Sequence, residues 1–317
     1  MVEYLISCIH RTKEYLLELV TTLWWAIIAI ALSSLYREAI KDKLFGQLIR
    51  KNTTIIPVSV NLCFIRECNF ECGSFHTQKT SHLKSYEQIQ RGLRLLRDAG
   101  MKKIQFTGGE PLLYPQLLSK MVEYCKADLK LESVSILTDG SKLTKRFMIR
   151  SAKYLDFIAV SCDSFDEGAN VHIGRGTRAH VADVQDAARL CCKYGVKLEI
   201  RTEISRYNFE DDMAVHIMAL QPSRWRVFRV PIREGRHILN KPVHDARRFQ
   251  ITVLEFQQFC ARHSHLDCFV SEAHGNTDAP SLLVDEYFRF LNRGTGDSTE
   301  SILDVGVERA LKTVYWV

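Results

Sequence analysis

Short apolar runs alternate with amphipathic stretches over most of the chain after Val58. Six of the runs are rich in β-branched and aromatic residues, as buried strands are. These runs are Val58–Ile65, Lys102–Thr107, Ser133–Thr138, Leu155–Cys162, Val196–Ile204 and Arg224–Val230. Apolar residues at helical spacing in the gaps predict helices at Pro115–Cys125, His180–Tyr194, Glu210–Leu220 and Thr252–Ala261. The alternation of strand and helix predicts an α/β fold with a parallel sheet.

Two local signals refine this pattern. Ser85 and Gln88 form a capping box that predicts the start of a helix, and Gly100 marks its end. Near the C-terminus the pattern loosens: His274–Ser281 is rich in turn residues and predicts a loop, while Ser301–Leu311 predicts a short helix.

The N-terminal segment Leu19–Leu35 carries no charge and, as a helix, is just long enough to cross a thin bilayer. Glu14 and Glu18 argue against a secretory leader, which has a basic start. Trp24 and Trp25 lie in the middle of the segment, where a spanning helix favours leucine, so an interfacial helix is an equally good interpretation. A buried core helix is the third possibility. Lysine and arginine residues downstream favour a cytosolic location for the rest of the chain.

Composition adds few constraints. A chain of 317 residues with 46% apolar content can build one large α/β domain. The net charge of +6 fits a phosphate-bearing small substrate or an anionic membrane face, and no dense basic and aromatic stripe argues for nucleic acid. The ten cysteines are scattered, several inside apolar runs, which predicts reduced thiols rather than a disulfide framework.

Candidate chemistry begins where the first predicted strand ends. Cys68 and Cys72 follow that strand, and their thiolates suit an iron–sulfur cluster or zinc. Two cysteines alone are equally well explained as buried apolar residues. Gly108, Gly109 and Glu110, followed by a proline, come directly after the second predicted strand, and such glycines allow a close backbone approach to a ligand.

Together these motifs resemble the radical S-adenosylmethionine (SAM) superfamily, which has a C-x3-C-x2-C cluster loop and a GGEP segment. Further segments resemble the viperin family within it, from about Val58 to the C-terminus. They are Asn69–Gly73, Phe75–Thr77, Ser161–Glu167, Ile173–Gly176, Asp285–Tyr287 and Ser301–Glu308. The resemblance implies a partial (β/α)6 barrel over residues 52–290, preceded by a membrane-associated helix and linker at 1–51 and followed by a C-terminal extension at 291–317.

The resemblance also implies a reaction and a location. In the family, three cysteine thiolates hold a 4Fe–4S cluster, SAM binds the open iron, and the resulting radical converts CTP to a chain-terminating dideoxy-didehydro nucleotide in antiviral defence. The implied location is the cytosolic face of the endoplasmic reticulum membrane, or lipid droplets. The segment Val314–Val317 stops short of the acidic, tryptophan-terminated tail that recruits iron–sulfur assembly proteins in the family.

Site residues follow from the matching motifs. The resemblance places Gly108, Gly109 and Glu110 at the SAM ammonium, Ser161 at the SAM ribose, and Arg175 between cofactor and substrate. It also implies a set of basic residues that would bind the triphosphate. These are Lys103, Arg224 and Arg226.

The chain departs from the family at the third cysteine. Phe75 occupies the required position, with Ser74 nearest to the missing ligand. Cys63 is a candidate substitute because its thiol is a soft ligand that closely precedes Cys68, although a core role for it is also predicted. His76 is a further candidate, and Ser74 would be a poor donor to a soft metal.

The predicted substrate site departs from the family as well. Glu199 and Arg201 stand where the family has lysine and asparagine, and a glutamate repels a triphosphate. Two readings of function therefore remain: a viperin-like radical SAM enzyme, or a catalytically impaired, membrane-tethered scaffold that acts through protein contacts. An error in the gene sequence that dropped a cysteine codon would explain the cluster loop without loss of function.

Overall fold

The computed structural model describes residues 56–72, 81–176, 179–230, 246–272, 281–292 and 297–312. The chain divides into two units, Met1–Ile55 and Ile56–Val317, and the described residues all belong to the second. The predicted N-terminal helix at Leu19–Leu35 lies outside the described residues, as do Ser74 and His76. Within the described part, no helix is both long enough and apolar enough to cross a membrane.

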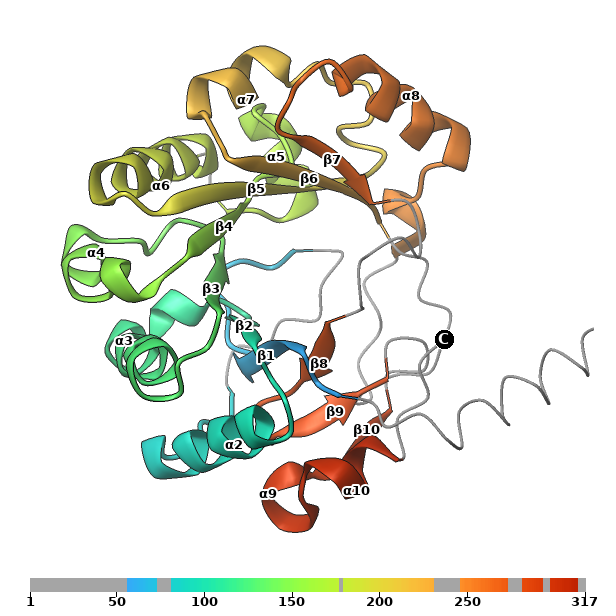
Figure 1. Ribbon diagram of the computed structural model, residues 1–317. Coiled ribbons are helices and arrows are strands. Elements are labelled where there is room, and N and C mark those ends of the chain that lie inside the picture. Colours follow the sequence, from blue (N-terminus) through green and yellow to red (C-terminus); the bar gives the residue numbers. More distant parts are fainter. Residues whose placement is uncertain are drawn as a thin grey trace, which may run out of the picture. The chain divides into compact units, whose positions relative to one another are not determined.

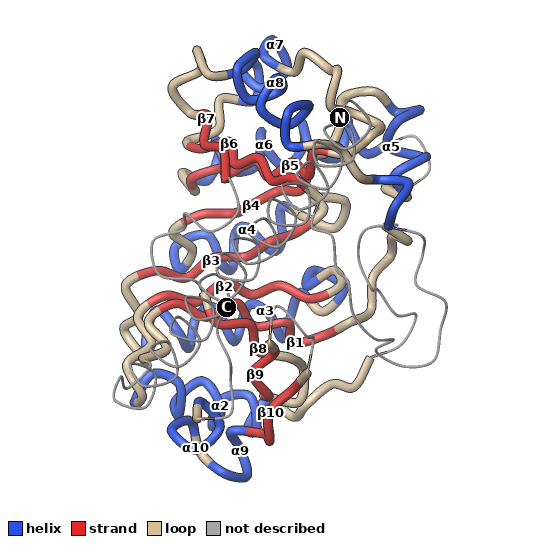
Figure 2. The backbone as a smooth tube through the Cα atoms, turned by 90° about the vertical axis from the view of Figure 1, so that its right-hand side faces the viewer, coloured by secondary structure: helices blue, strands red, loops and turns tan. Residues whose placement is uncertain are grey.

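A single ten-stranded sheet organises this unit, in the order β10-β9-β8-β1-β2-β3-β4-β5-β6-β7. Figure 2 shows the strands in this order, with β7 at the top and β10 at the bottom. Pairing is parallel from β8 through β7 and antiparallel at β8–β9 and β9–β10. The strands are β1 Ser59–Ile65, β2 Lys103–Gly108, β3 Ser133–Thr138, β4 Phe157–Ser161, β5 Lys197–Ile204, β6 Arg224–Arg229, β7 Phe269–Glu272, β8 Leu282–Val284, β9 Arg289–Leu291 and β10 Ser298–Ser301. The six predicted strands are confirmed as β1 to β6, with small shifts at their ends.

Helices α2 to α8 lie between the parallel strands in the chain, α9 and α10 follow the last strand, and the helices cover one face of the sheet (Figure 1). They are α2 Tyr86–Asp98, α3 Pro115–Glu123, α4 Lys145–Ser151, α5 Glu167–Ile173, α6 His180–Tyr194, α7 Ala214–Leu220, α8 Val253–His263, α9 Ile302–Val305 and α10 Val307–Leu311. The capping box of Ser85 and Gln88 is present at the start of α2. The predicted C-terminal helix is split into α9 and α10 at Gly306, whose φ is +80°.

Two differences from the sequence prediction have local causes. Helix α7 begins at Ala214 rather than Glu210, because residues 206–210 form turns instead of helix. Asp212, one residue before the N-cap Met213, accepts the Ala214 N–H at 3.0 Å. Helices α4 and α5 were not predicted, and each is too short for a clear apolar period. Their side-chain caps, Thr144 and Asp166, are the signals that identify them.

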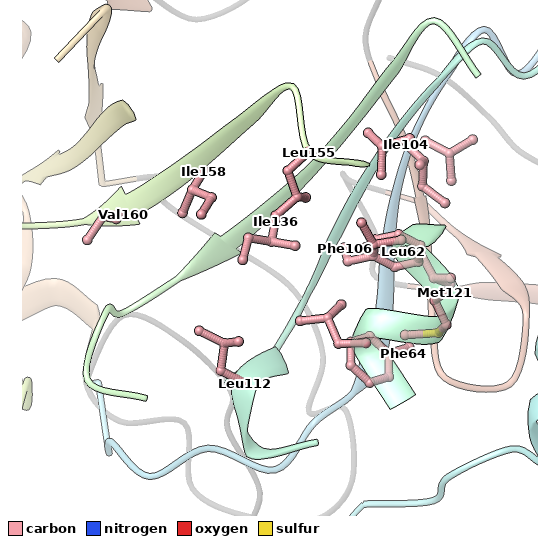
Figure 3. Packing of buried hydrophobic residues seen from close by; sticks show 14 of the residues in the cluster. Leu62, Phe64, Ile104, Phe106, Leu112, Met121, Ile136, Leu155, Ile158 and Val160 are labelled. Atoms are coloured by element: carbon pink, nitrogen blue, oxygen red, sulfur yellow. The ribbon is translucent and has the colours of Figure 1, made fainter. Parts of the chain in front are cut away.

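The core lies between the sheet and the helices. Alternate residues along each strand point to this side, as the period of a strand requires. Figure 3 shows part of this layer, with Leu62 and Phe64 from β1, Ile104 and Phe106 from β2, and Met121 from α3. The other alternate positions form the inner face of the sheet, which is largely polar in β1 to β6. The polar residues of the inner face lie outside the apolar core and are therefore available to form a binding or catalytic site.

Candidate functional site

The two cysteines lie on a segment that leaves β1, here called the cysteine loop (residues 66–72), and β2 holds its start. The N–H of Gly109 donates to the carbonyl oxygen of Ile65 at 2.9 Å. A Cβ atom on Gly108 would lie 2.1 Å from that oxygen, and one on Gly109 would lie 1.9 Å from the carbonyl oxygen of Glu67. Glycine is required at both positions because any side chain would collide with backbone.

The end of the cysteine loop is held by the residues that follow α5. A Cβ atom on Gly174 would lie 2.3 Å from the carbonyl oxygen of Glu71 and 3.1 Å from the Cα of Cys72. A Cβ atom on Gly176 would lie 2.7 Å from the ring of Phe70. The predicted SAM motif and the predicted Arg175 segment therefore pack against opposite ends of the same loop.

Both thiols of the loop are sheltered. Cys68 is partly buried and Cys72 is buried. Burial raises the pKa of Cys68 to about 12 and also raises the pKa of Cys72, which the neighbouring Arg175 guanidinium opposes. Without a metal these thiols are therefore protonated at neutral pH, and a soft metal ion would have to replace the proton.

The described residues show no third side chain placed with Cys68 and Cys72 to ligate a cluster. Cys63 lies on β1, partly buried, in register with Thr107 of β2. Within the described ranges, no group of three histidine, cysteine, aspartate or glutamate side chains could hold a metal ion. The described chain thus supplies two thiols for a cluster. The candidates Ser74 and His76 lie outside it.

Glu110 is buried, and both oxygens of its carboxylate accept hydrogen bonds from other residues of the protein. Oε1 accepts the N–H of Leu112 at 2.9 Å and the hydroxyl of Thr138 at 2.7 Å, and Oε2 accepts the N–H of Asp139 at 2.8 Å. Burial and the nearby Asp139 carboxylate raise the pKa of Glu110 to about 8. Glu110 therefore joins β2 to the end of β3, and a SAM ammonium would have to share its oxygens with three donors.

Asp139 is a site residue that the sequence analysis missed. It follows β3 directly and is buried, and its Oδ1 accepts the N–H of Ser141 at 2.8 Å. Its Oδ2 is buried and has no hydrogen-bond partner among the described residues. An unpaired buried carboxylate oxygen is costly, so this atom suits a cationic ligand such as the ammonium group of SAM. The available signal was its position at the carboxyl end of a parallel strand.

Arg175 is fixed beside the cysteine loop by a buried ion pair. Its Nε donates to Oδ2 of Asp163, which follows β4, and Oδ1 of Asp163 accepts the N–H of Glu203 at 2.9 Å. Ser161, at the end of β4, contributes its carbonyl oxygen to Nε2 of His180 at 3.1 Å and keeps its hydroxyl on the inner face. Ser161 and Arg175 thus lie in the same part of the site, since Asp163, which pairs with Arg175, is two residues after Ser161.

The predicted basic residues lie on two strands, β2 and β6. Arg224 and Arg226 lie on the inner face of β6 around Glu199, which is buried at 3% exposure. Lys103 lies exposed at the start of β2, in register with Ser133 at the start of β3. Lys103 and Arg224 are each the first residue of a parallel strand, so both lie toward the edge where these strands begin, opposite to Ser161 and the cysteine loop.

The radical SAM superfamily model matches residues 61–212, a range that contains the cysteine loop, the glycine pair and Arg175. Among solved structures, the chain resembles Streptococcus suis SuiB bound to S-adenosylmethionine, with a TM-score of 0.63 and 13% identity over 84% of this chain and 68% of that one. It also resembles anSMEcpe with bound AdoMet, with a TM-score of 0.60 and 14% identity over 81% and 78% of the two chains. At this identity the likeness concerns the fold.

Sequence relatives are closer. The S-adenosylmethionine-dependent nucleotide dehydratase RSAD2 of Oncorhynchus mykiss is 42% identical over 263 residues, which cover 81% of this chain and 76% of the relative. The S-adenosylmethionine-dependent nucleotide dehydratase of Flammeovirga pacifica is 31% identical over 273 residues, covering 81% and 90% of the two chains. This degree of identity shows that the chain belongs to the viperin family of radical SAM proteins, and the packing of the glycine motif on the cysteine loop agrees with this.

Proposed function

We propose that this protein is a SAM-dependent nucleotide dehydratase that uses a 4Fe–4S cluster. The observation that carries the proposal is the packing of the cysteine loop between the glycines after β2 and those after α5. These glycines hold the loop beside Glu110 and Arg175, the residues that the family resemblance assigns to SAM. This arrangement supports the enzyme over a scaffold that acts through protein contacts alone.

Each neighbouring residue has a role in this proposal. Cys68 and Cys72 would ligate the cluster, which when bound supplies the one-electron cleavage of SAM. Asp139, with Glu110 beside it, would accept the SAM ammonium, since its buried Oδ2 has no partner among the described residues. Arg175 would orient the carboxylate of SAM or the substrate, because Asp163 holds its guanidinium in place.

The third cluster ligand is part of the proposal and has a direct test. Cys63 is the candidate tested first, because its soft thiol lies on the strand that leads into the cysteine loop, although it forms no three-residue metal group with other described side chains. Iron and sulfide content and the electron paramagnetic resonance spectrum are measured for the full chain after anaerobic reconstitution. The parent protein is expected to hold a reducible cluster, and Cys63→Ala is expected to lose it. Cys192→Ala is the matched control, because Cys192 is exposed.

The outcomes separate the candidate functions. A cluster that persists in Cys63→Ala would assign the third ligand elsewhere, with Ser74 and His76 as the next candidates. Absence of a cluster in the parent protein would overturn the radical mechanism. Nucleotide binding without SAM cleavage would then support the scaffold.

The finer features complete the proposal. The proposed substrate is CTP, and its product is proposed to act in antiviral defence. The proposed location is the cytosolic face of the endoplasmic reticulum membrane or of lipid droplets.

The uncharged segment Leu19–Leu35 supports membrane association. Flotation of the full chain with anionic vesicles tests it, and Trp24→Glu is expected to reduce the bound fraction. Unchanged flotation of that variant would refute the interfacial helix.

A further inference from the structure

One buried histidine ring contacts both segments that the proposed enzyme needs for its cofactors. His180 is the first residue of α6 and is 1% exposed. Its Nε2 lies 3.1 Å from the carbonyl oxygen of Ser161, and its ring packs edge-on against Phe70 of the cysteine loop, with ring centres 5.7 Å apart. Ser161 is the predicted contact of the SAM ribose, and Phe70 lies between the two cysteines of the loop.

The hydrogen bond to Ser161 holds the end of β4. On the β3 side, the parallel ladder ends at Val160, which is in register with Thr138, so Ser161 lies one residue beyond it. A carbonyl oxygen only accepts, so Nε2 of His180 carries the proton in this contact. Helix α6 thus supplies a donor to the residue whose hydroxyl faces the predicted site.

The ring contact holds the middle of the cysteine loop. Phe70 also lies against Gly176, where a Cβ atom would lie 2.7 Å from its ring. The N–H of Phe70 donates to Sγ of Cys68 at 3.4 Å. Edge-to-face packing of two rings is directional, so His180 restricts where Phe70 lies. The position of the first thiol is therefore coupled to the imidazole through Phe70.

The start of α6 is itself anchored. The N–H of Val181, the residue after His180, donates to Oε1 of Glu167 at 2.8 Å. Glu167 is the first residue of α5, which ends at Gly174 beside the cysteine loop. The imidazole is therefore held from its own helix, and both of its contacts are made from a fixed base.

We infer that His180 is a positioning residue that aligns SAM with the cluster, through Ser161 on one side and Phe70 on the other. The inference rests on the proposed function and adds a residue to its site. His180 acts through these two residues and does not itself touch a reacting atom. Small errors in the alignment of reactants cost large factors in rate, so a ring that fixes the separation of the two supports matters for the reaction.

Two substitutions separate the two contacts. His180→Phe keeps an aromatic ring against Phe70 but removes the N–H that donates to Ser161. His180→Gln keeps an N–H donor but removes the ring. His265→Gln is the matched control, because His265 is exposed.

Three readouts follow the variants in the full chain. Calorimetry on anaerobically reconstituted protein gives the dissociation constant of SAM, and chemical analysis gives the iron content. Mass spectrometry follows the alkylation of Cys68 by iodoacetamide in protein without cofactors. A role in folding alone would move all three readouts together.

The expected results are opposite for the two variants. His180→Phe is expected to bind SAM about tenfold more weakly, as for a lost buried hydrogen bond, with unchanged iron content and alkylation rate. His180→Gln is expected to alkylate Cys68 at least about threefold faster and to hold less iron, because the loop is less sheltered. In the fraction that holds a cluster, His180→Gln should bind SAM more tightly than His180→Phe does.

Three results would overturn the inference. One is a SAM affinity of His180→Phe equal to that of the parent. Another is an alkylation rate of His180→Gln equal to that of the parent. The last is an equal loss of iron and SAM affinity in both variants, which reports a general loss of structure. A parent protein that binds no SAM refutes the proposed function and this inference together, whereas a parent that binds SAM with an unchanged His180→Phe refutes only the inference.

Discussion

Gly174 packs against the backbone of Cys72, with its missing Cβ only 3.1 Å from the Cα of that cysteine. Gly174 is also the C-cap of α5 and has a φ of +94°. The end of a helix that is distant in sequence thus determines where the second thiol of the cysteine loop lies. Changes at Gly174 should therefore affect metal binding without altering any ligand.

Gly174→Ala is expected to lower both stability and iron content. A left-handed alanine costs about 1–2 kcal/mol, and the collision with Glu71 adds to this cost by displacing the loop. The measurements are the free energy of unfolding and iron bound after reconstitution. Gly195→Ala is the control, because Gly195 has a φ of +67° and nothing within 4 Å of a Cβ. If both variants bind iron equally, the packing of Gly174 does not position the loop.

The start of the cysteine loop is tied to the C-terminal part of the chain. Nε of Arg66 lies 2.8 Å from both carboxylate oxygens of Glu286, whose side chain is 6% exposed. Glu286→Gln is expected to lower the free energy of unfolding by about 1–3 kcal/mol, because it weakens a sheltered, charge-assisted contact. Chemical denaturation measures this, and iron content should fall in parallel. Retention of full stability and iron would show that the pair does not anchor the loop.

The burial of His180 predicts that the stability of the protein depends on pH. Its Nε2 donates to Ser161, and burial, followed by the nearby Arg175 charge, lowers its pKa to about 4. An unfolded histidine has a pKa of about 6.5 and so binds a proton more readily than the folded one. The contribution of His180 to the free energy of unfolding is therefore fully present above about pH 6.5. It is lost as the pH falls towards 4, which lowers the free energy of unfolding by up to about 3 kcal/mol.

The measurement is the free energy of unfolding from pH 4 to 7. His180→Gln is expected to remove most of this slope, because glutamine does not titrate. His265→Gln, at an exposed histidine, serves as the control. An unchanged slope in His180→Gln would assign the acid sensitivity to other groups.

Thiol reactivity tests the cysteine loop independently of turnover. At pH 8, Cys68 is expected to react with iodoacetamide at least about tenfold more slowly than exposed Cys192, because burial raises the pKa of Cys68 to about 12. Reconstitution with iron and sulfide should protect Cys68 and Cys72 further, and a chelator should reverse that protection. Mass spectrometry follows each cysteine. Equal rates for Cys68 and Cys192 would refute the buried loop.

Much of the fold was predictable, because strand and helix periods record which side of each element is buried. The strand Ser133–Thr138 and the helix His180–Tyr194 have the predicted ends. The strands β7 to β10 were not predicted, since short strands with three or four residues carry too little pattern. The glycines after β2 could be singled out from the sequence because their motif is local.

The sequence alone determined the fold class and the family, because apolar period and short motifs are properties of neighbouring residues. Only the tertiary structure decided which distant side chains meet. It placed Glu199 among three arginines and brought Asp139 beside Glu110. The physical reason is that these contacts depend on the register between strands and on the edge at which each residue emerges, which spacing along the chain does not encode.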